Sequence, residues 1–299
     1  ASRSFARIMK PFSGRKKAGL NVDLLKLRQT ANRVRKDIIE AVHAAKSGHP
    51  GGSLSVADIL TYLYFAEMKI DPANPDMEER DRFVLSKGHA TPAYYGVLAE
   101  RGFFPADDLK TFRHTGSYLQ GHPDRKNIPG VDMSSGSLGQ GFSVAVGMAL
   151  SAKLSGRGYR TYALLGDGEI QEGQIWEATM FAGARKLDNL VAIIDNNGLQ
   201  IDGSIEVVCS PYPIAEKFEA FNFHVEEANA HDFSALQRAF DEARRTKGMP
   251  TAIILQSVKG KGVSFMENKV SWHGSAPNDE EYRAAMTELE EEGRSLCKD

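Results

Sequence analysis

Cysteine is scarce in this chain of 299 residues, which contains only Cys209 and Cys297. Two thiols cannot build the disulfide framework of a small secreted domain, so we expect a protein of a reducing compartment, the cytoplasm. The sequence also lacks any run of about eighteen apolar residues, the length that a membrane-spanning helix needs. We therefore expect no membrane partner.

An excess of charge of either sign is also missing. The chain has 37 Lys and Arg residues against 39 Asp and Glu residues, a formal net charge of -2. Because a balanced surface creates no global field that attracts polyanions, no nucleic-acid partner is expected. Hydrophobic residues make up 41% of the chain, enough for one large core or two modest ones.

Acidic residues are absent from the first 22 positions. This segment carries Arg3, Arg7, Lys10, Arg15, Lys16 and Lys17 before the first acid, Asp23. An organelle transit peptide is one interpretation, since such segments are basic and poor in acid, and the missing apolar stretch argues against a secretory signal. A solvated basic tail over residues 1–22 is the interpretation we favour.

Apolar residues follow two kinds of pattern in the rest of the chain. Helical spacing predicts helices over residues 22–47, 56–68, 144–154, 175–186 and 233–245, with another beginning near Pro92. Short apolar runs predict strands over residues 82–85, 161–165, 190–194, 223–226 and 251–255. Apolar strands between amphipathic helices are typical of a parallel sheet covered on both faces. We therefore predict one three-layer α/β domain over residues 23–277, followed by an acidic helix and tail over residues 278–299.

Two polar motifs each come directly after a predicted strand: Gly166-Asp167-Gly168 and Asp195-Asn196-Asn197. Ligands of an open parallel sheet bind beyond the carboxyl ends of its strands, so neighbouring strands would bring Asp167 and Asn197 together. Carboxylate, amide and carbonyl oxygens suit Mg²⁺, or Ca²⁺ or Mn²⁺, and phosphates complete the metal shell. Gly168 would let a phosphate approach the backbone. Each motif alone is typical of a turn or helix cap, but the pair favours a metal-diphosphate site.

Four histidines lie beside glycine in predicted loops: His49, His89, His122 and His273. A lone loop histidine is usually a solvated or capping group, whereas four in similar loops suggest a common role. Zinc is the rival explanation, but the cysteines are not placed to help and no His-x₃-His pair exists. Imidazoles can instead donate to diphosphate oxygens or sugar hydroxyls and move protons near neutral pH.

These histidine loops, together with the segment from Gly136 to Gly141, resemble the N-terminal region of transketolases in order and in local sequence. The resemblance runs from about Leu25 to about Pro277. The Gly-Asp-Gly and Asn-Asn pair is similar to the signature of thiamine-diphosphate enzymes. The resemblance thus implies the thiamine-diphosphate-binding fold and two cofactors, thiamine diphosphate and a divalent metal. It implies metal ligation by three residues: Asp167, Asn197 and the carbonyl of Leu199.

The resemblance also implies roles for individual side chains. His89 and His273 would contact the cofactor diphosphate, His49 and His273 would lie near the reacting carbon of the sugar, and His122 would bind the donor's hydroxyls. The catalytic residues would therefore be His49, His122 and His273. The other implied cofactor contacts are Gly136, Ser137, Leu138, Gly168, Glu169 and Asn197.

The resemblance also covers two acidic residues near the start of the helix predicted over residues 175–186. They are Glu172 and Glu177, which match family positions linked to communication between active sites. Acids at the start of a helix are also favoured by the helix dipole alone. Ser137 stands where many full-length transketolases carry Pro, a change that we expect to alter loop stiffness more than chemistry.

The chain is much shorter than a full-length transketolase, and no segment resembles the pyrimidine-binding domain, whose Glu activates the cofactor. The resemblance therefore implies one chain of a split transketolase. Its partner would be a C-terminal transketolase subunit, in an α2β2 heterotetramer that acts on sugar phosphates.

The implied reaction is transfer of a two-carbon ketol unit from a ketose phosphate to an aldose phosphate, as in pentose phosphate metabolism. A deoxyxylulose-phosphate synthase or a 2-oxoacid dehydrogenase of the α type would share Gly-Asp-Gly and Asn-Asn, but neither is expected to show this set of histidine loops. Ketol transferases for branched or sulfonated sugars stay open, because they share these residues. A non-catalytic scaffold is disfavoured, since it has no use for Asp167, Asn197 and four loop histidines.

Overall fold

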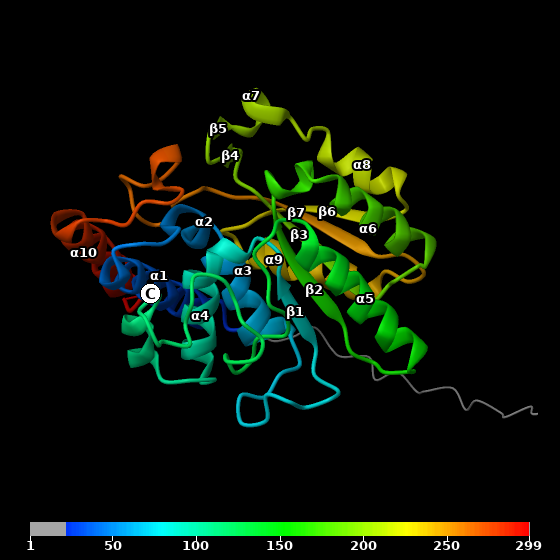
Figure 1. Cartoon of the computed structure of the whole chain (residues 1–299), viewed down its shortest axis with the longest axis horizontal. Coiled ribbons are helices and arrows are strands. Elements are labelled where there is room, and N and C mark those ends of the chain that lie inside the picture. Colours follow the sequence, from blue (N-terminus) through cyan, green and yellow to red (C-terminus); the bar gives the residue numbers. More distant parts are fainter. Residues whose placement is uncertain (1–21, 299) are drawn as a thin grey trace, which may run out of the picture.

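The computed structural model describes residues 22–298 of the chain (Figure 1). The basic tail predicted over residues 1–22 lies outside the described residues, apart from Val22. Within the part of the chain that the structure describes, every helix is too short or too polar to cross a membrane.

Five parallel strands form the central sheet, in the order β1-β2-β3-β7-β6. Their bounds are β1 (Arg82–Leu85), β2 (Thr161–Gly166), β3 (Leu190–Asn196), β6 (His224–Asn229) and β7 (Thr251–Gln256). Strands β2 and β3 are neighbours, with pairing from Thr161↔Leu190 to Gly166↔Asp195. Nearly every residue of β2, β3 and β7 is buried. This explains why these strands read as continuous apolar runs in the sequence.

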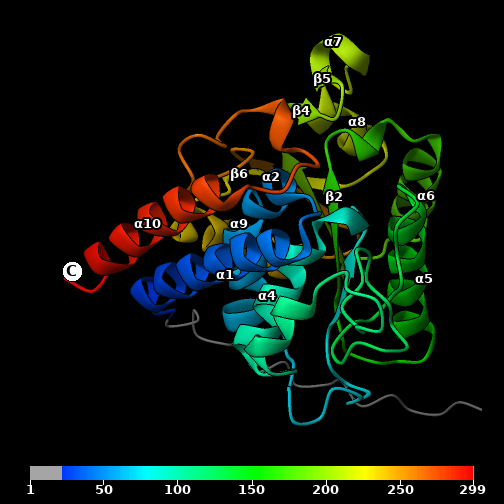
Figure 2. The ribbon, with the colours of Figure 1, turned by 60° about the vertical axis from the view of Figure 1, so that its left-hand side comes forward.

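Helices cover both faces of the sheet, so the predicted three-layer α/β fold is confirmed (Figure 2). One face packs against α1 (Leu24–Ala45), α3 (Ala57–Tyr62), α4 (Thr91–Arg101) and α9 (Phe233–Arg245). The opposite face packs against α5 (Gln140–Leu154), α6 (Gly173–Ala184) and α8 (Ile214–Ala220). Alternate residues of each strand pack into the cores on opposite faces of the sheet. Leu164 packs into the core beside α1, and Leu165 packs into the core beside α5.

Helix α5 begins earlier than the apolar pattern predicts, at Gln140 instead of Val144. Gly139 adopts a left-handed conformation with φ of 84° before the helix, and its backbone N–H donates to Glu169 Oε1 at 2.9 Å. A glycine turn tied to a distant carboxylate therefore starts α5, which periodicity alone does not reveal.

The helix predicted over residues 56–68 is present, but its second half is the π-helical turn η1 (Leu63–Glu67) that continues α3. Other short elements lie in segments where no helix or strand was predicted. They are α2 (Pro50–Leu54), η2 (Gly88–Ala90), η3 (Ala106–Thr111), η4 (Glu169–Gln171), β4 (Leu199–Gln200), β5 (Gly203–Ser204), α7 (Ile205–Cys209) and η5 (Val270–Trp272).

The last helix, α10 (Asp279–Ser295), is acidic as predicted but not merely a surface helix. Asn278 and Glu281 form a capping box at its start. Ala285 and Leu289 are buried in the core that includes α1, and Tyr282 stacks on His43 with ring centroids 4.1 Å apart. Helix α10 therefore packs along α1, as Figure 2 shows.

Gly183 in α6 should not tolerate a side chain, although alanine is the better helix former. A Cβ at this position would lie 1.8 Å from the carbonyl oxygen of Phe221, a backbone atom. We expect Gly183→Ala to lower the free energy of unfolding by about 2–3 kcal/mol, measured by urea denaturation. At Gly147 in α5, where a Cβ meets no atom within 4 Å, the same change should raise it by about 1 kcal/mol. Equal effects at the two positions would contradict this packing.

Candidate functional site

A pocket of about 420 Å³ lies at the carboxyl ends of the strands, where the segments after β1, β2, β3 and β7 meet the loop before α2. Parallel sheets commonly bind ligands at this edge. The predicted site residues that line it are His49, His89, Gly136, Leu138, Asp167, Gly168, Glu169, Asn197, Leu199 and His273. Two other predicted residues, Ser137 and His122, are not among its lining.

Asp167 lies beside the Asn197 loop because β2 and β3 are neighbouring strands, as the sequence predicted. Its Oδ1 accepts from the backbone N–H of Gly168 at 2.8 Å, and its Oδ2 accepts from that of Gly198 at 2.6 Å. Burial, reinforced by the nearby Asp195, raises the pKa of Asp167 to about 7. Among the residues that the structure describes, no Lys, Arg or His side chain forms an ion pair with it. A bound cation would supply the missing counter-charge.

The oxygen donors around Asp167 fit a hard divalent cation. The Asn197 side chain is held by two hydrogen bonds, since its Oδ1 accepts from Leu199 N–H at 3.1 Å and its Nδ2 donates to Asp195 at 3.0 Å. Leu199 lines the same pocket. Carboxylate, amide and carbonyl oxygens are the ligands that Mg²⁺ and Ca²⁺ take. Within residues 22–298, no three His, Cys, Asp or Glu side chains gather as a metal site.

Lys259 lines the same pocket, although the sequence analysis did not single it out. The residue is only 1% exposed, and its Nζ donates to the carbonyl of Leu199 at 3.1 Å and to Nδ1 of His273 at 2.9 Å. Burial and the neighbouring Lys87 lower the pKa of Lys259 to about 8. Its position could have been recognised, because Lys259-Gly260 follows the strand β7 closely, just as Asp167-Gly168 follows β2.

A buried ion pair between Lys87 and Asp195 forms the base of this pocket. Lys87 Nζ donates to Asp195 Oδ2 at 2.5 Å and to the carbonyl of Gly52 at 3.0 Å. Asp195 also accepts hydrogen bonds from the hydroxyls of Ser55 and Ser257. Burial opposes ionisation of Asp195, but Lys87 and these hydrogen bonds hold its pKa below the usual value. Both residues stand inside motifs noted in the sequence, yet the pairing itself was not predicted.

Glu169 binds the protein's own backbone and one hydroxyl. Its Oε1 accepts from Ser86 Oγ at 2.5 Å and Gly139 N–H at 2.9 Å, and its Oε2 accepts from Gly166 N–H at 3.1 Å. This carboxylate therefore joins the end of β2 to the glycine turn before α5. In this arrangement Glu169 shapes the pocket wall.

Three of the four predicted histidines come together as a triangle of rings. The ring centroids lie 5.1 Å apart for His49 and His89, 5.5 Å for His49 and His273, and 5.3 Å for His89 and His273. Burial first, and nearby cations second, lower the pKa of His49 to about 4, that of His273 to about 3 and that of His89 well below its usual value. All three rings are thus neutral at pH 7, each with one N–H donor and one acceptor.

Hydrogen bonds to cations decide which ring nitrogen carries the proton. Lysine and arginine have no acceptor, so a ring nitrogen that meets them must be unprotonated. Lys259 Nζ lies 2.9 Å from His273 Nδ1, and Arg113 Nη2 lies 3.4 Å from His49 Nδ1. In both histidines Nε2 therefore carries the proton and remains a hydrogen-bond donor.

His122 is exposed and lies outside the histidine triangle. It stays close to the pocket wall, since a Cβ added to Gly136 would lie 3.3 Å from its Cδ2. Burial and Arg113 lower the pKa of His122. The position fits a contact at the mouth of the pocket.

Bare backbone lines the side of the pocket that faces the buried cations and imidazoles. A Cβ at Gly52 would lie 3.6 Å from His89 Nε2 and 3.8 Å from Lys87 Nζ. The absent side chain leaves room for an anion between these donors.

Glu172 lines the same pocket, and Glu177 is exposed on α6.

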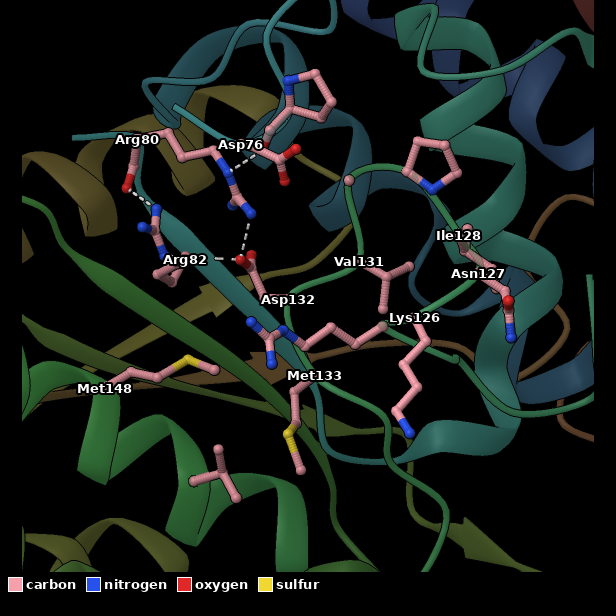
Figure 3. A pocket seen from close by; sticks show the side chains of 15 residues that line it. Asp76, Arg80, Arg82, Lys126, Asn127, Ile128, Val131, Asp132, Met133 and Met148 are labelled. Carbon is pink, nitrogen blue, oxygen red and sulfur yellow. Dashed lines mark hydrogen bonds and ion pairs between the residues drawn. The ribbon is translucent and has the colours of Figure 1, made fainter. Parts of the chain in front are cut away.

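A larger pocket of about 900 Å³ lies at the amino end of β1, and none of the predicted site residues lines it. Figure 3 shows Arg80 and Arg82 directed at Asp132 inside it. Arg80 pairs with Asp132 at 2.6 Å and donates to the carbonyls of Pro75 and Asp81, while Arg82 donates to the carbonyl of Glu78 at 2.9 Å. These guanidinium groups are already occupied by acceptors of the protein itself, so they stabilise the loop. We therefore assign ligand binding to the smaller pocket at the carboxyl ends of the strands.

Comparison with known families shows which family the chain resembles. Residues 27–294 match the family described as "Transketolase, thiamine diphosphate binding domain". The matched stretch extends beyond the predicted limit near Pro277 and includes most of α10.

Two relatives are similar along almost their whole length. The chain is 46% identical to the 6-deoxy-6-sulfo-D-fructose transketolase subunit SqwG of Clostridium sp., over 89% of this chain and 97% of that protein. It is 42% identical to a protein of Phocaeicola vulgatus that is named as a subunit of apulose-4-phosphate transketolase, over 94% of this chain and 99% of that protein.

Solved transketolases share the fold over a part of their length. The transketolase of Campylobacter jejuni superposes with a TM-score of 0.82 at 32% identity, covering 93% of this chain and 46% of that one. The chain therefore spans about half the length of this solved relative.

The buried ring of His49 should make the stability of the chain depend on pH. Its folded pKa of about 4 lies below the ordinary value of 6.5, so the unfolded ring binds a proton that the folded ring does not. The stability that this provides is present above pH 6.5 and is lost as the pH falls toward about 4. In His49→Gln the free energy of unfolding should fall less steeply over this window. Identical slopes, in urea denaturation at several pH values, would contradict a buried neutral ring.

Proposed function

Since this chain belongs to the transketolase family, through the domain that binds thiamine diphosphate, we propose that it is one subunit of a two-chain transketolase. The second chain would supply the pyrimidine-binding domain, and two chains of each kind would form an α2β2 heterotetramer. The proposal is supported by two relatives that are named as subunits and that the chain covers almost completely.

One observation carries the proposed site: a buried carboxylate without a cationic partner in residues 22–298 and a set of hydrogen-bond donors line the same pocket. Asp167, Asn197 and the carbonyl of Leu199 would hold a divalent metal, Mg²⁺ or else Ca²⁺ or Mn²⁺. The diphosphate would accept hydrogen bonds from His89, His273 and Lys259. A metal and a diphosphate compensate each other's charge, which suits a pocket that carries both an acid and a lysine.

The remaining predicted contacts would come from backbone atoms. The carbonyl and N–H groups of Gly136, Ser137 and Leu138 would line the rings of the cofactor, and Gly168 would let the diphosphate approach the end of β2. Glu169 would support this wall through its bonds to Gly139 and Gly166, and this carboxylate is not proposed to contact the cofactor directly.

When bound, thiamine diphosphate supplies the electron sink for breaking a carbon–carbon bond beside a ketose carbonyl. The proposed reaction is transfer of a two-carbon ketol unit from a ketose phosphate to an aldose phosphate. His49 and His273 would donate Nε2–H to sugar oxygens and move protons there, because Arg113 and Lys259 leave that nitrogen protonated. His122 would bind the donor's hydroxyls at the mouth of the pocket.

A specialised sugar is the second candidate substrate. The two relatives that the chain covers almost completely are named for 6-deoxy-6-sulfo-D-fructose and for apulose-4-phosphate, both ketoses with an anionic group. We therefore propose an anionic ketose as donor, either in the pentose phosphate pathway or in the breakdown of such a modified sugar. The cytoplasm is the proposed location, as the reduced exposed cysteines Cys209 and Cys297 suggest.

Reconstitution with a partner chain tests the two-subunit proposal. We expect this chain alone to turn over no sugar, and the pair to transfer ketol units only in the presence of thiamine diphosphate and Mg²⁺. Xylulose 5-phosphate, 6-deoxy-6-sulfo-D-fructose and apulose 4-phosphate should be compared as donors, with ribose 5-phosphate or glyceraldehyde 3-phosphate as acceptor. Turnover by this chain alone would overturn the proposal.

Replacement of His273 tests the proposed proton transfer. In the reconstituted pair, His273→Ala should lower kcat by about 10²–10⁴-fold, because a positioned imidazole donor is lost from the reacting sugar. His114→Ala provides the control, since His114 is exposed on a loop and does not line the pocket. Unchanged turnover of the His273 variant would contradict the assigned role.

A further inference from the structure

Lys259 belongs to a short loop after β7. Hydrogen bonds hold this loop in place on the side away from the pocket. The two residues that flank Lys259-Gly260, Val258 and Lys261, form backbone hydrogen bonds to side chains from other elements. Gly260 takes φ of 81°, and its N–H donates to the carbonyl of Gly51 at 2.9 Å. The position of Lys259 therefore depends on contacts made by its neighbours.

His231 holds the first side of this loop. It lies between β6 and α9, and its Nε2 accepts from Val258 N–H at 3.0 Å. A backbone N–H can only donate, so Nε2 is unprotonated and Nδ1 carries the proton. That Nδ1 lies 2.7 Å from Asp58 Oδ2 and donates to it. One hydrogen bond sets the tautomer, and the other orients the ring.

Arg35 holds the second side. Its Nε donates to the carbonyl of Lys261 at 3.1 Å, and its Nη2 donates to Asp58 Oδ2 at 2.5 Å. Arg35 is on α1 and Asp58 is on α3, and they are 8% and 5% exposed. Burial alone would raise the pKa of Asp58, but Arg35 and His231 hold it at about 2. The Asp58 carboxylate thus orients the side chains of Arg35 and His231, and each of these donates to or accepts from the loop backbone through another of its nitrogen atoms.

We infer that Arg35, Asp58 and His231 are positioning residues for Lys259, and through it for the cofactor diphosphate. None of the three lines the cofactor pocket, so they act only through the loop backbone. The inference rests on the proposed function, in which Lys259 binds the diphosphate. A loop whose backbone is fixed at residues 258 and 261 before binding loses less backbone freedom when Lys259 binds a ligand.

The contacts themselves point to positioning beyond general stability. The Arg35–Asp58 pair would join α1 to α3 without any bond to the loop. The structure instead directs Arg35 Nε and His231 Nε2 at backbone groups on either side of Lys259. Supporting groups that orient a binding residue commonly change affinity by about tenfold or more when removed.

Two substitutions of His231 separate the loop contact from the carboxylate contact. In His231→Asn, the amide nitrogen can replace Nδ1 and keep the bond to Asp58, but nothing reaches Val258. In His231→Gln, the longer amide can reach Val258 N–H but gives up Asp58. We expect His231→Asn to weaken thiamine diphosphate binding by about tenfold, and His231→Gln to weaken it much less. Calorimetric titration of the reconstituted pair at saturating Mg²⁺ measures both, alongside thermal unfolding without cofactor.

A control substitution breaks a similar pair elsewhere. His224 Nε2 lies 2.7 Å from Glu226 Oε1 on the edge strand β6, with no contact to the loop. His224→Asn removes this histidine–carboxylate pair and should leave the affinity for thiamine diphosphate unchanged. A loss equal to that of His231→Asn would show a general effect of stability and overturn the inference.

A double-mutant cycle tests whether His231 acts through Lys259. If it does, His231→Asn should cause no further loss of affinity in a Lys259→Ala background, because the group that it positions is gone. Additive losses would overturn the inference, as would wild-type affinity in His231→Asn alone. A wild-type pair that binds no thiamine diphosphate even at millimolar concentration would instead overturn the proposed function on which the inference rests.

Discussion

The parallel pairing of β2 with β3 is the interaction on which the candidate site depends. The register that sets Gly166 opposite Asp195 carries Asp167 and the Asn197 loop to the same edge of the sheet. There the Gly198 N–H donates to Asp167, so that the two segments are joined directly. A slip of one residue would turn every side chain of a strand to the other face. Alternate side chains of both strands are packed into two different cores, so a slip would repack both of them, and core packing thereby determines where the polar site forms.

Charge is distributed in this pocket in a way that suits a ligand with both signs of charge. Asp195 and Lys87 neutralise each other beneath it, whereas Asp167 lacks a cation among the described residues and Lys259 contacts only a carbonyl and an imidazole. The three imidazoles are held neutral by burial, so they act as donors without adding charge. The protein thus leaves one acid and one lysine for a metal-diphosphate pair, which agrees with the family to which it belongs.

The proposed division of labour between two chains is consistent with the arrangement of the pocket. This chain contributes the proposed metal ligands, the proposed diphosphate donors and an imidazole pair with Nε2–H available. His122 is exposed next to Gly136 and outside the pocket lining, and in the proposed enzyme a donor sugar would meet it there. The chain spans about half of a solved transketolase, and the relatives that it covers almost fully are named as subunits. The proposed two-chain enzyme accounts for both facts.

Sequence alone determined the strand cores, the alternation of strand and helix, and the polar motifs at strand ends. The proximity of Asp167 to the Asn197 loop could be predicted, because parallel strands bring their carboxyl ends to a common edge. The grouping of the histidines was expected only from their similar loops and from the resemblance to transketolases. Only the tertiary structure revealed the Lys87–Asp195 pair, the place of Lys259 beside His273, and the Arg35–Asp58–His231 chain behind it. Lys87 and Asp195 are 108 positions apart, and His231 and Asp58 are 173 apart. Local periodicity reports which face of an element is buried, but contacts between distant side chains arise only when the elements pack.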